Sequence, residues 1–466
     1  MTILERLGTR RRRPPLSRAA LLVLSVATFA ACERPIVYEA GTPALDTSLR
    51  KWLAFSGVAP AGTVRPQDPA LVDLGRALFF DKILSGNRDV SCATCHDPLK
   101  ATGDGLSLSI GTGAVVKGSA RTLGTGRQYV PRNAPSLLNQ GLASINLFWD
   151  ARVAEEFPGP RRYRTPAGAA LPTGLESLLA AQAMFPVADR SEMRGEVGDR
   201  DVFGAANELA PYDNAQLAEI WNAVMRRLLA VDGYVARFQA AYPGVPVDQF
   251  GFEHAANALA AFQVQAFTYT NSPFDQYIAG NNEALTDEAK EGALLFFTGT
   301  RCSACHFGPL LGSGTFAATA TPQLGPGLGS DAPLDRGMAI QFVGQTQRFI
   351  FRVPPLRNVE LSAPYMHAGA YATLDAVLRH YNDVEKALRT YDVTQLQPSL
   401  RPAYHGDAAT IEVLLAARDS RIRQPFGFSE NELKQLVTFL KSLTDPAARD
   451  LSAVIPASVP SGLAVR

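Results

Sequence analysis

The sequence predicts a mainly α-helical fold made of two similar domains with few short strands. Three observations carry this prediction. The motif Cys-x-x-Cys-His occurs twice, at residues 92–96 and 302–306. The pattern Gly-x-x-Leu-Phe-Phe precedes each copy, at residues 75–80 and 292–297. Helical periodicity is strong along the chain, whereas strand signals are weak. A pattern that recurs in this way indicates two related domains.

The Cys-x-x-Cys-His motif is the attachment site of c-type haem. Its two thiols add to the vinyl groups of the porphyrin, and the following His becomes an axial ligand of the iron. A zinc site would need four ligands from clustered pairs, and a redox pair of cysteines would need neither a His nor a second copy. Four of the five cysteines lie in these motifs. The sequence therefore predicts two covalently bound c-type haems, held by Cys92, Cys95 and His96 and by Cys302, Cys305 and His306.

Three helices are predicted from apolar periodicity. The first covers Leu71, Leu74 and Leu78, which lie on one face ahead of the first motif. The second lies within residues 248–272, and the third spans residues 429–443. The third begins with Ser429 followed three residues later by Glu432, which is a capping box.

The remaining segments carry weaker signals. Short strands are expected at residues 341–343 and 349–351. Proline and glycine gather at residues 157–174 and 321–333, which predicts loops. The tail after Asp445 is expected to be loose.

Composition and charge narrow the class of protein. The chain has 466 residues, 46% of them hydrophobic, and a formal net charge of +1. This length suggests two or three domains. The near-zero charge gives no electrostatic reason to expect a nucleic acid partner. Because cysteine is scarce outside the motifs, the fold does not depend on disulfides.

The N-terminus is predicted to direct export to the periplasm. Arginines at positions 10–13 precede a short apolar stretch at residues 19–31, which is too short to span a bilayer and reads as a secretory signal. Cys32 follows Phe-Ala-Ala, which looks like a lipoprotein cleavage site, although Phe29 stands where that pattern prefers Leu. Cys32 is therefore the candidate for a lipid anchor, and ordinary cleavage after Ala30 or Ala31 is the alternative.

The motifs and helices together suggest domain boundaries. These are a signal peptide at 1–31, a linker at 32–66, a first haem domain at 67–280, a second haem domain at 281–446 and a tail at 447–466.

Residues 71–444 resemble the bacterial di-haem cytochrome c peroxidases and their relative, MauG. The markers are found at residues 74–81, 91–96, 132–136 (Arg-Asn-Ala-Pro-Ser), 148–150 (Phe-Trp-Asp), 352–359 (Arg-Val-Pro-Pro-Leu-Arg-Asn-Val) and 363–367. The resemblance implies a two-domain, mostly helical periplasmic protein. It also implies that the first haem reacts with hydrogen peroxide and that the second receives electrons from a small cytochrome c or cupredoxin.

The resemblance also bears on the free axial position of each iron. No His lies between His96 and His254, so the first iron is expected to be five-coordinate or water-bound, as in MauG. Eight residues after Thr373, where the peroxidases have a Met ligand, this chain has Tyr381, and MauG uses a Tyr there. The alternative is that Tyr381 belongs to an ordinary buried helix face. Other candidate ligands of the second iron are Met366, His367 and His380.

The predicted peroxide pocket departs from the family. Leu147 stands where the peroxidases have a Gln, and alignment puts Ala180 at the position of their catalytic Glu. Glu156 and Glu176 are the candidates for moving a proton between the peroxide oxygens, with solvated surface charge as the alternative. Arg152 is either a cation that polarises peroxide or part of a surface ion pair.

The family carries a calcium ion bound largely by backbone oxygens. Ser362 and Pro364 match two of its ligands, whereas the Asn ligand has no counterpart in residues 103–126.

Three functions remain open at the level of sequence. The first is a peroxidase that reduces hydrogen peroxide with electrons from a small periplasmic redox protein, and this is our prediction. The second is a MauG-like oxidase that modifies a partner protein, which Tyr381 favours. The third is a di-haem electron-transfer protein without enzymatic activity, which Leu147 and Ala180 favour.

Overall fold

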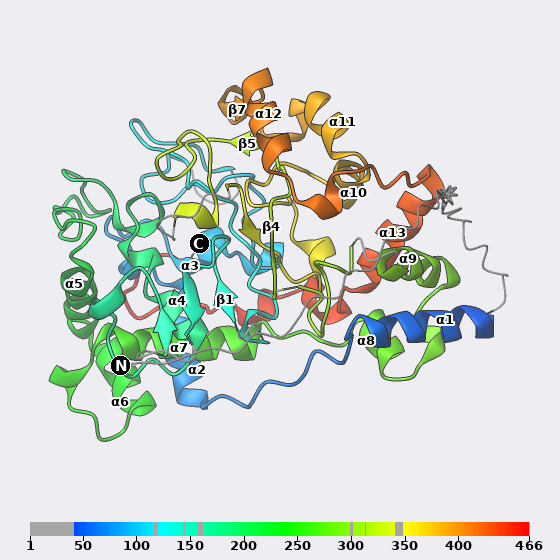
Figure 1. The fold of residues 1–466 in the computed structure, drawn as a ribbon. Coiled ribbons are helices and arrows are strands. Elements are labelled where there is room, and N and C mark those ends of the chain that lie inside the picture. The colour runs from blue at the N-terminus through cyan, green and yellow to red at the C-terminus, as the bar shows by residue number, and fades with distance from the viewer. Residues whose placement is uncertain are drawn as a thin grey trace, which may run out of the picture. The chain divides into compact units, whose positions relative to one another are not determined.

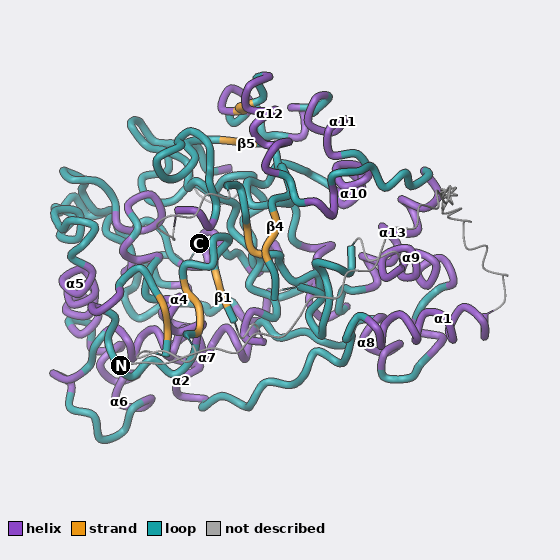
Figure 2. Tube along the Cα trace, viewed as in Figure 1, coloured by secondary structure: helices purple, strands orange, loops and turns teal. Residues whose placement is uncertain are grey.

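Among the described residues, helices far outweigh strands, which are two or three residues long, and loops connect them, as predicted (Figure 2). The computed structural model describes residues 42–115, 120–142, 145–156, 162–298, 302–312, 314–340 and 348–465. The predicted signal peptide, Cys32 and the strand at residues 341–343 lie outside the described residues. Among the described residues, no helix combines the length and apolar character needed to cross a membrane.

In its described residues, the first motif region, residues 69–266, contains six α-helices and one small sheet (Figure 1). The helices are α2 (Pro69–Phe80), α3 (Cys92–Cys95), α4 (Leu178–Ala183), α5 (Leu217–Leu229), α6 (Asp232–Ala241) and α7 (Phe252–Ala266). The antiparallel sheet has the order β1 (Asn146–Leu147), β2 (Val153–Glu155) and β3 (Tyr163–Arg164).

The second motif region, residues 273–443, likewise consists of helices with a few short strands. Its helices are α8 (Pro273–Ile278), α9 (Asp287–Phe297), α10 (Leu374–Asn382), α11 (Val384–Arg389), α12 (Ala408–Ala417) and α13 (Glu430–Ser442). The strands described in this region form two antiparallel pairs, β4 (Phe316–Ala317) with β6 (Phe351–Arg352), and β5 (Gln323–Leu324) with β7 (Tyr404–His405).

The same close helix pair recurs in both regions. α2 packs against α7, and α9 packs against α13. A Cβ atom added at Gly75 would lie 1.9 Å from the carbonyl oxygen of Ala258, and one added at Gly292 would lie 2.0 Å from that of Gln435. The glycine of each Gly-x-x-Leu-Phe-Phe pattern is therefore required because two backbones meet there. This packing explains why the pattern occurs twice.

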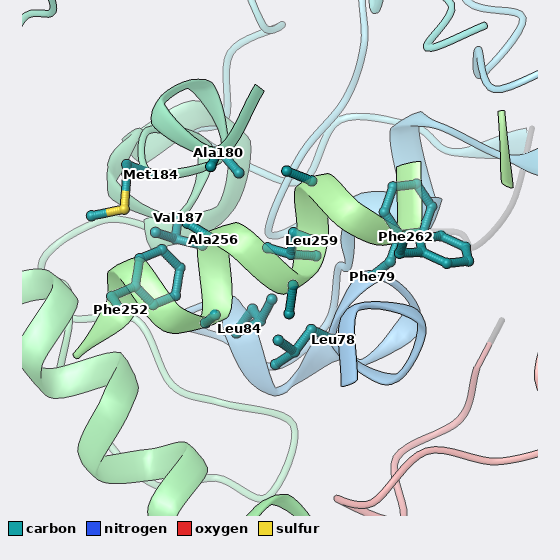
Figure 3. Packing of buried hydrophobic residues seen from close by; sticks show 14 of the residues in the cluster. Leu78, Phe79, Leu84, Ala180, Met184, Val187, Phe252, Ala256, Leu259 and Phe262 are labelled. Atoms are coloured by element: carbon teal, nitrogen blue, oxygen red, sulfur yellow. The ribbon is translucent and has the colours of Figure 1, made fainter. Parts of the chain in front are cut away.

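The core of the first region forms around α7, which lies between α2 and α4 (Figure 3). Leu78 and Phe79 of α2 pack against it from one side, and Met184, just after α4, from the other. Phe79 and Phe262 approach with ring centroids 5.2 Å apart. Burial of such side chains contributes roughly 1.5–3 kcal/mol each, so this cluster fixes the loops that carry the first motif.

The N-terminal helix α1 (Thr42–Phe55) packs against α9 of the second region. Leu49 is fully buried. Asp46 forms a buried ion pair with Lys290 (3.1 Å) and accepts a hydrogen bond from the hydroxyl of Tyr277 (2.9 Å). The predicted linker thus contains a helix that is anchored to the second half of the chain.

The C-terminal tail packs on the first region, so the expectation of a loose tail is wrong. Leu451 is 1% exposed and joins the core cluster of that region. Ser461 donates a hydrogen bond to Asp81 (2.6 Å), and Arg76 donates one to the carbonyl oxygen of Val454 (2.8 Å). The tail is held by single apolar residues and isolated hydrogen bonds, which produce no periodic pattern in the sequence.

The helix predictions hold with shifted ends. α2 contains the predicted apolar face, and α7 occupies the middle of the predicted run at residues 248–272. α13 begins after Ser429, whose hydroxyl accepts from the amide of Glu432 (3.3 Å) while the Glu432 carboxylate accepts from the amide of Ser429 (2.8 Å). The predicted capping box is confirmed.

Candidate haem sites

The first haem motif forms a single helical turn, α3. The amide of His96 donates to the carbonyl oxygen of Cys92 (2.9 Å), and the Thr94 hydroxyl accepts from the amide of Ser91 (2.9 Å). This turn brings the thiols of Cys92 and Cys95 to one side and leaves His96 at its end. That arrangement is what attachment at two vinyl groups requires.

The ring of His96 is oriented by a backbone carbonyl. Its Nδ1 lies 3.0 Å from the carbonyl oxygen of Thr102. A carbonyl can only accept, so Nδ1 carries the hydrogen and Nε2 keeps its lone pair. Burial lowers the pKa of His96, which favours the neutral ring. A neutral ring with a free Nε2 is the form that binds iron.

The second motif repeats this geometry. The amide of His306 donates to the carbonyl oxygen of Cys302 (2.9 Å), and Nδ1 of His306 lies 3.0 Å from the carbonyl oxygen of Leu311. Burial lowers the pKa of His306 to about 4. Both proximal histidines are therefore presented to an iron in the same tautomer.

A buried cation also fits a haem in the second region. Arg352 is 3% exposed, and burial lowers the pKa of its guanidinium to about 10. Its Nε and Nη1 have no hydrogen-bond partner in the part of the chain that the structure describes. A buried charge without a partner is costly, and the carboxylates of a porphyrin would satisfy it. When bound, the haems supply redox-active iron at both motifs.

Sequence reasoning missed Glu192, the carboxyl that lies beside the first motif. Burial, with a contribution from the charge of Glu192, raises the pKa of the Cys92 and Cys95 thiols to about 12. Glu192 keeps part of its surface open but is densely enclosed by protein. This enclosure is the main reason that the pKa of its carboxyl rises to about 8, and the charge of Asp189 adds to the shift while that of Arg152 opposes it. Glu192 is therefore a protonated acid near neutral pH.

The backbone around Glu192 holds it in place. Asp189 caps the turn Arg190–Arg194 and accepts from the amide of Glu192 (3.0 Å). The amide of Thr112 donates to the carbonyl oxygen of Glu192 (3.0 Å). A Cβ atom at Gly111 would lie 2.3 Å from that oxygen, so glycine allows this close approach. In the sequence, Glu192 lies six residues after Pro186, whereas the alignment pointed to Ala180.

The predicted acid candidates occupy other environments. Glu156 and Glu176 are exposed, and their proposed role stays a prediction. Ala180 is fully buried in the hydrophobic core, and Leu147 is buried in β1. Arg152 pairs with Asp150 (3.1 Å) and is 21% exposed. Its charge acts on Glu192, so Arg152 lies near this carboxyl as well as in an ion pair.

Tyr381 and Met366 meet beside the second motif. The hydroxyl of Tyr381 lies 4.0 Å from the sulfur of Met366. Burial raises the pKa of Tyr381, and the nearby thiols of Cys305 and Cys302 contribute to the shift. Two of the predicted ligand candidates therefore lie together next to the haem-binding cysteines, on α10 and on the loop before it. Tyr381 as iron ligand remains a prediction.

The other histidines are occupied by protein contacts. His380 is fully buried, with Nδ1 at 2.7 Å from the Tyr371 hydroxyl and Nε2 at 2.8 Å from the carbonyl oxygen of Thr319. His367 stacks on Phe351 with centroids 3.7 Å apart. These contacts make His380 a poor alternative ligand, because both of its nitrogens are used.

A buried ionic network joins the two regions. Arg132 pairs with Asp150 (2.7 Å) and Asp335 (2.6 Å). Burial alone would raise the pKa of Asp150, but the charges of Arg152 and Arg132 lower it to about 2. Next to this network, the amide of Arg352 donates to the carbonyl oxygen of Trp149 (2.8 Å). The two ion pairs and this hydrogen bond therefore fix residues 148–150 against the second region.

Within the described residues, no group of three or more His, Cys, Asp or Glu side chains forms a metal site. The predicted calcium ligands, Ser362 and Pro364, would act through backbone oxygens and are not addressed by this finding.

Comparison with known proteins now identifies the family. Residues 69–283 match the family model of di-haem cytochrome c peroxidases. The methylamine utilization protein MauG of Methylorubrum extorquens is 30% identical over 392 residues, covering 84% of this chain and 82% of that protein. Cytochrome c551 peroxidase of Pseudomonas aeruginosa is 29% identical over 299 residues, covering 64% and 67%.

Solved structures agree in fold. A MauG-like protein associated with microbial copper homeostasis matches with a TM-score of 0.54 and 25% identity, covering 84% of this chain and 94% of that one. The diheme peroxidase BthA of Burkholderia thailandensis matches with a TM-score of 0.56 and 22% identity, covering 88% and 96%. This protein belongs to the family of di-haem cytochrome c peroxidases and MauG proteins, and is an oxidoreductase of peroxidase type with two c-type haems.

Proposed function

We propose that this chain reduces hydrogen peroxide to water at its first haem, with electrons that a small periplasmic redox protein delivers to the second. One observation carries the proposal. The first motif has the protonated carboxyl of Glu192 beside it, whereas the second has Tyr381 and Met366, which can cap an iron. An open iron reacts and a capped iron relays electrons.

In this proposal Glu192 moves the proton that cleavage of the peroxide bond requires. Its neutral carboxyl donates a proton to the oxygen that leaves as water and takes up the proton of the oxygen that stays. Two electrons and two further protons complete the reduction of one peroxide to two waters. Arg152 and Asp189 set the balance between the two forms of Glu192, because their charges act on its pKa in opposite directions.

Replacing Glu192 tests this assignment. Glu192→Gln keeps the shape of the side chain and removes the acid, so the rate of peroxide reduction is expected to fall by about 10²–10⁴-fold. The absorption spectra of both haems should stay unchanged. The exposed Glu176→Gln is the matched control and should retain full activity. Loss of activity in Glu176→Gln with retention in Glu192→Gln would instead support the prediction made from sequence.

A second candidate function is MauG-like oxidation of a partner protein. It is favoured by the position of Tyr381 beside Cys302 and Cys305, since a phenolate ligand stabilises oxidised iron and a thioether favours reduced iron. Tyr381→Phe keeps the ring and removes the oxygen. If Tyr381 is the ligand, the spectrum of the second haem changes and its potential rises. If the spectrum and potential stay constant, the Tyr381 assignment fails and Met366 becomes the leading candidate.

Further features of the proposal concern location and organisation. We infer export to the periplasm, a lipid anchor at Cys32, calcium bound by Ser362 and Pro364, and haem domains at residues 67–280 and 281–446. Mass spectrometry of the mature N-terminus tests the anchor. Chelation followed by metal analysis tests the calcium.

A further inference from the structure

Five aromatic side chains form an unbroken row through the second motif region. Ring centroids are 5.5 Å apart for Tyr381 and His380, 5.2 Å for His380 and Tyr371, 5.6 Å for Tyr371 and Tyr391, and 5.0 Å for Tyr391 and Tyr404. We call this set the tyrosine row. Its members come from α10, from the loop before α10, from the loop after α11 and from β7. Each ring is in contact range of the next.

The tyrosine row connects the second haem motif with the surface. At its inner end, Tyr381 is near enough to Cys302 and Cys305 for their charges to act on the pKa of its hydroxyl. At its outer end, Tyr404 is partly exposed on β7. Tyr371, in the middle, is 3% exposed. A continuous series of aromatic rings from a haem site to solvent is a route for electrons.

The middle of the row contains a phenol hydrogen-bonded to a base. The carbonyl oxygen of Thr319 can only accept, so Nε2 of His380 donates to it (2.8 Å). In the neutral ring Nδ1 then carries a lone pair, and the Tyr371 hydroxyl donates to it (2.7 Å). The surrounding protein thus fixes His380 in the tautomer that can accept the phenolic proton.

This pairing matters because a tyrosine loses its proton when it is oxidised. A base within hydrogen-bond distance lets that proton move a short way and return. The Tyr391 hydroxyl donates to the carbonyl oxygen of Ala370, which cannot take up a proton. The Tyr381 hydroxyl faces the sulfur of Met366. Tyr371 is therefore the member of the row best placed for reversible oxidation. Packing alone would be served equally well by Phe at position 371.

We propose that Tyr371 is a redox-active tyrosine that links external one-electron donors at Tyr404 to the second haem. Tyr371 gives one electron toward that haem and its phenolic proton to Nδ1 of His380, which leaves a neutral tyrosyl radical and an imidazolium. An electron then arrives through Tyr391 from Tyr404, which takes it from the donor, and the proton returns from His380. The net result is one electron moved from the donor to the haem. The proposal rests on the proposed function, since peroxide supplies the oxidising power.

Electron paramagnetic resonance of the holoprotein tests the proposal. After addition of hydrogen peroxide, the unaltered protein should show a tyrosyl radical whose signal responds to exchange into deuterated water. Tyr371→Phe should abolish at least nine-tenths of this signal. Tyr277→Phe removes another hydrogen-bonded buried phenol, the partner of Asp46, and should leave the signal intact. A radical of full intensity in Tyr371→Phe would overturn the proposal.

A second measurement requires no substitution in the row. Peroxide added with a spin trap should label Tyr404, the partly exposed end, and peptide mapping locates the adduct. Adducts confined to tyrosines outside the row would overturn the proposal. Peroxide consumption measured on the same samples separates the two hypotheses. An unaltered protein that consumes no peroxide contradicts the proposed function, whereas normal consumption with no tyrosyl radical contradicts the tyrosine row alone.

Discussion

The first and second motif regions share the structure around the cysteines and the proximal histidine, and they differ in the other side chains near each motif. In both, a glycine allows two helices to meet, a single turn carries the cysteines, and a backbone carbonyl 3.0 Å from Nδ1 orients the proximal histidine. Near the motif, the first region also has Glu192, whereas the second has Tyr381 with Met366.

This difference follows from what each side of a haem has to do. Attachment and proximal ligation make the same chemical demand at both sites, so the same local geometry serves twice. The free axial position decides whether an iron reacts or relays. The residues that we propose to control it come from elements outside the repeated pattern, the turn Arg190–Arg194 and the helix α10. The residues near the free axial position can therefore differ between the two sites while the attachment geometry stays the same.

The largest loss of stability from a single substitution should come from adding a side chain where the two helices of each pair meet. Gly75→Ala and Gly292→Ala each place a Cβ about 2 Å from a backbone oxygen, which neither helix can avoid without moving apart. Each should lower the free energy of unfolding by about 3 kcal/mol, measured by urea denaturation. Gly314→Ala, where the nearest atom is 3.7 Å away, is the control. A large loss at one glycine only would show that the two helix pairs are not equivalent.

The pH dependence of stability should single out the first region. The pKa of Glu192 is about 8 in the folded chain, against 4.5 as the ordinary value. The folded chain therefore binds the Glu192 proton more tightly than the unfolded chain does. This contribution to the free energy of unfolding is complete below pH 4.5 and is lost as the pH rises through 8. The slope is at most about 1.4 kcal/mol per pH unit. Glu192→Gln should flatten the curve of unfolding free energy between these values. Parallel curves for the variant and the unaltered protein would argue against a raised pKa.

A smaller effect is expected where the tail meets the first region. Ser461→Ala removes the hydrogen bond to Asp81 and should cost about 1 kcal/mol. Because Asp81 directly follows α2, the loss should appear as faster hydrogen exchange in α2 and leave α9 unchanged. Equal changes in α2 and α9 would show that the tail stabilises the whole chain rather than this region.

Sequence reasoning succeeded where the chemistry is local. Five consecutive residues specify a c-type haem, so both motifs were identified without a structure. Sequence reasoning also predicted the capping box of Ser429 and Glu432 and the apolar face of α2, because both depend on residues within one or two turns. The family resemblance extended this to the fold and the type of activity.

Tertiary structure decided what depends on residues far apart in the chain. Glu192 differs from the exposed Glu156 and Glu176 only through its enclosure beside the first motif, and enclosure is a property of the folded chain. The tail docks through scattered residues with no period. The row from Tyr381 to Tyr404 joins side chains of α10, two loops and β7 that only the folded chain brings into contact. Spacing along a chain specifies bonds made within a turn, whereas burial, proton affinity and electron routes arise only when distant segments meet.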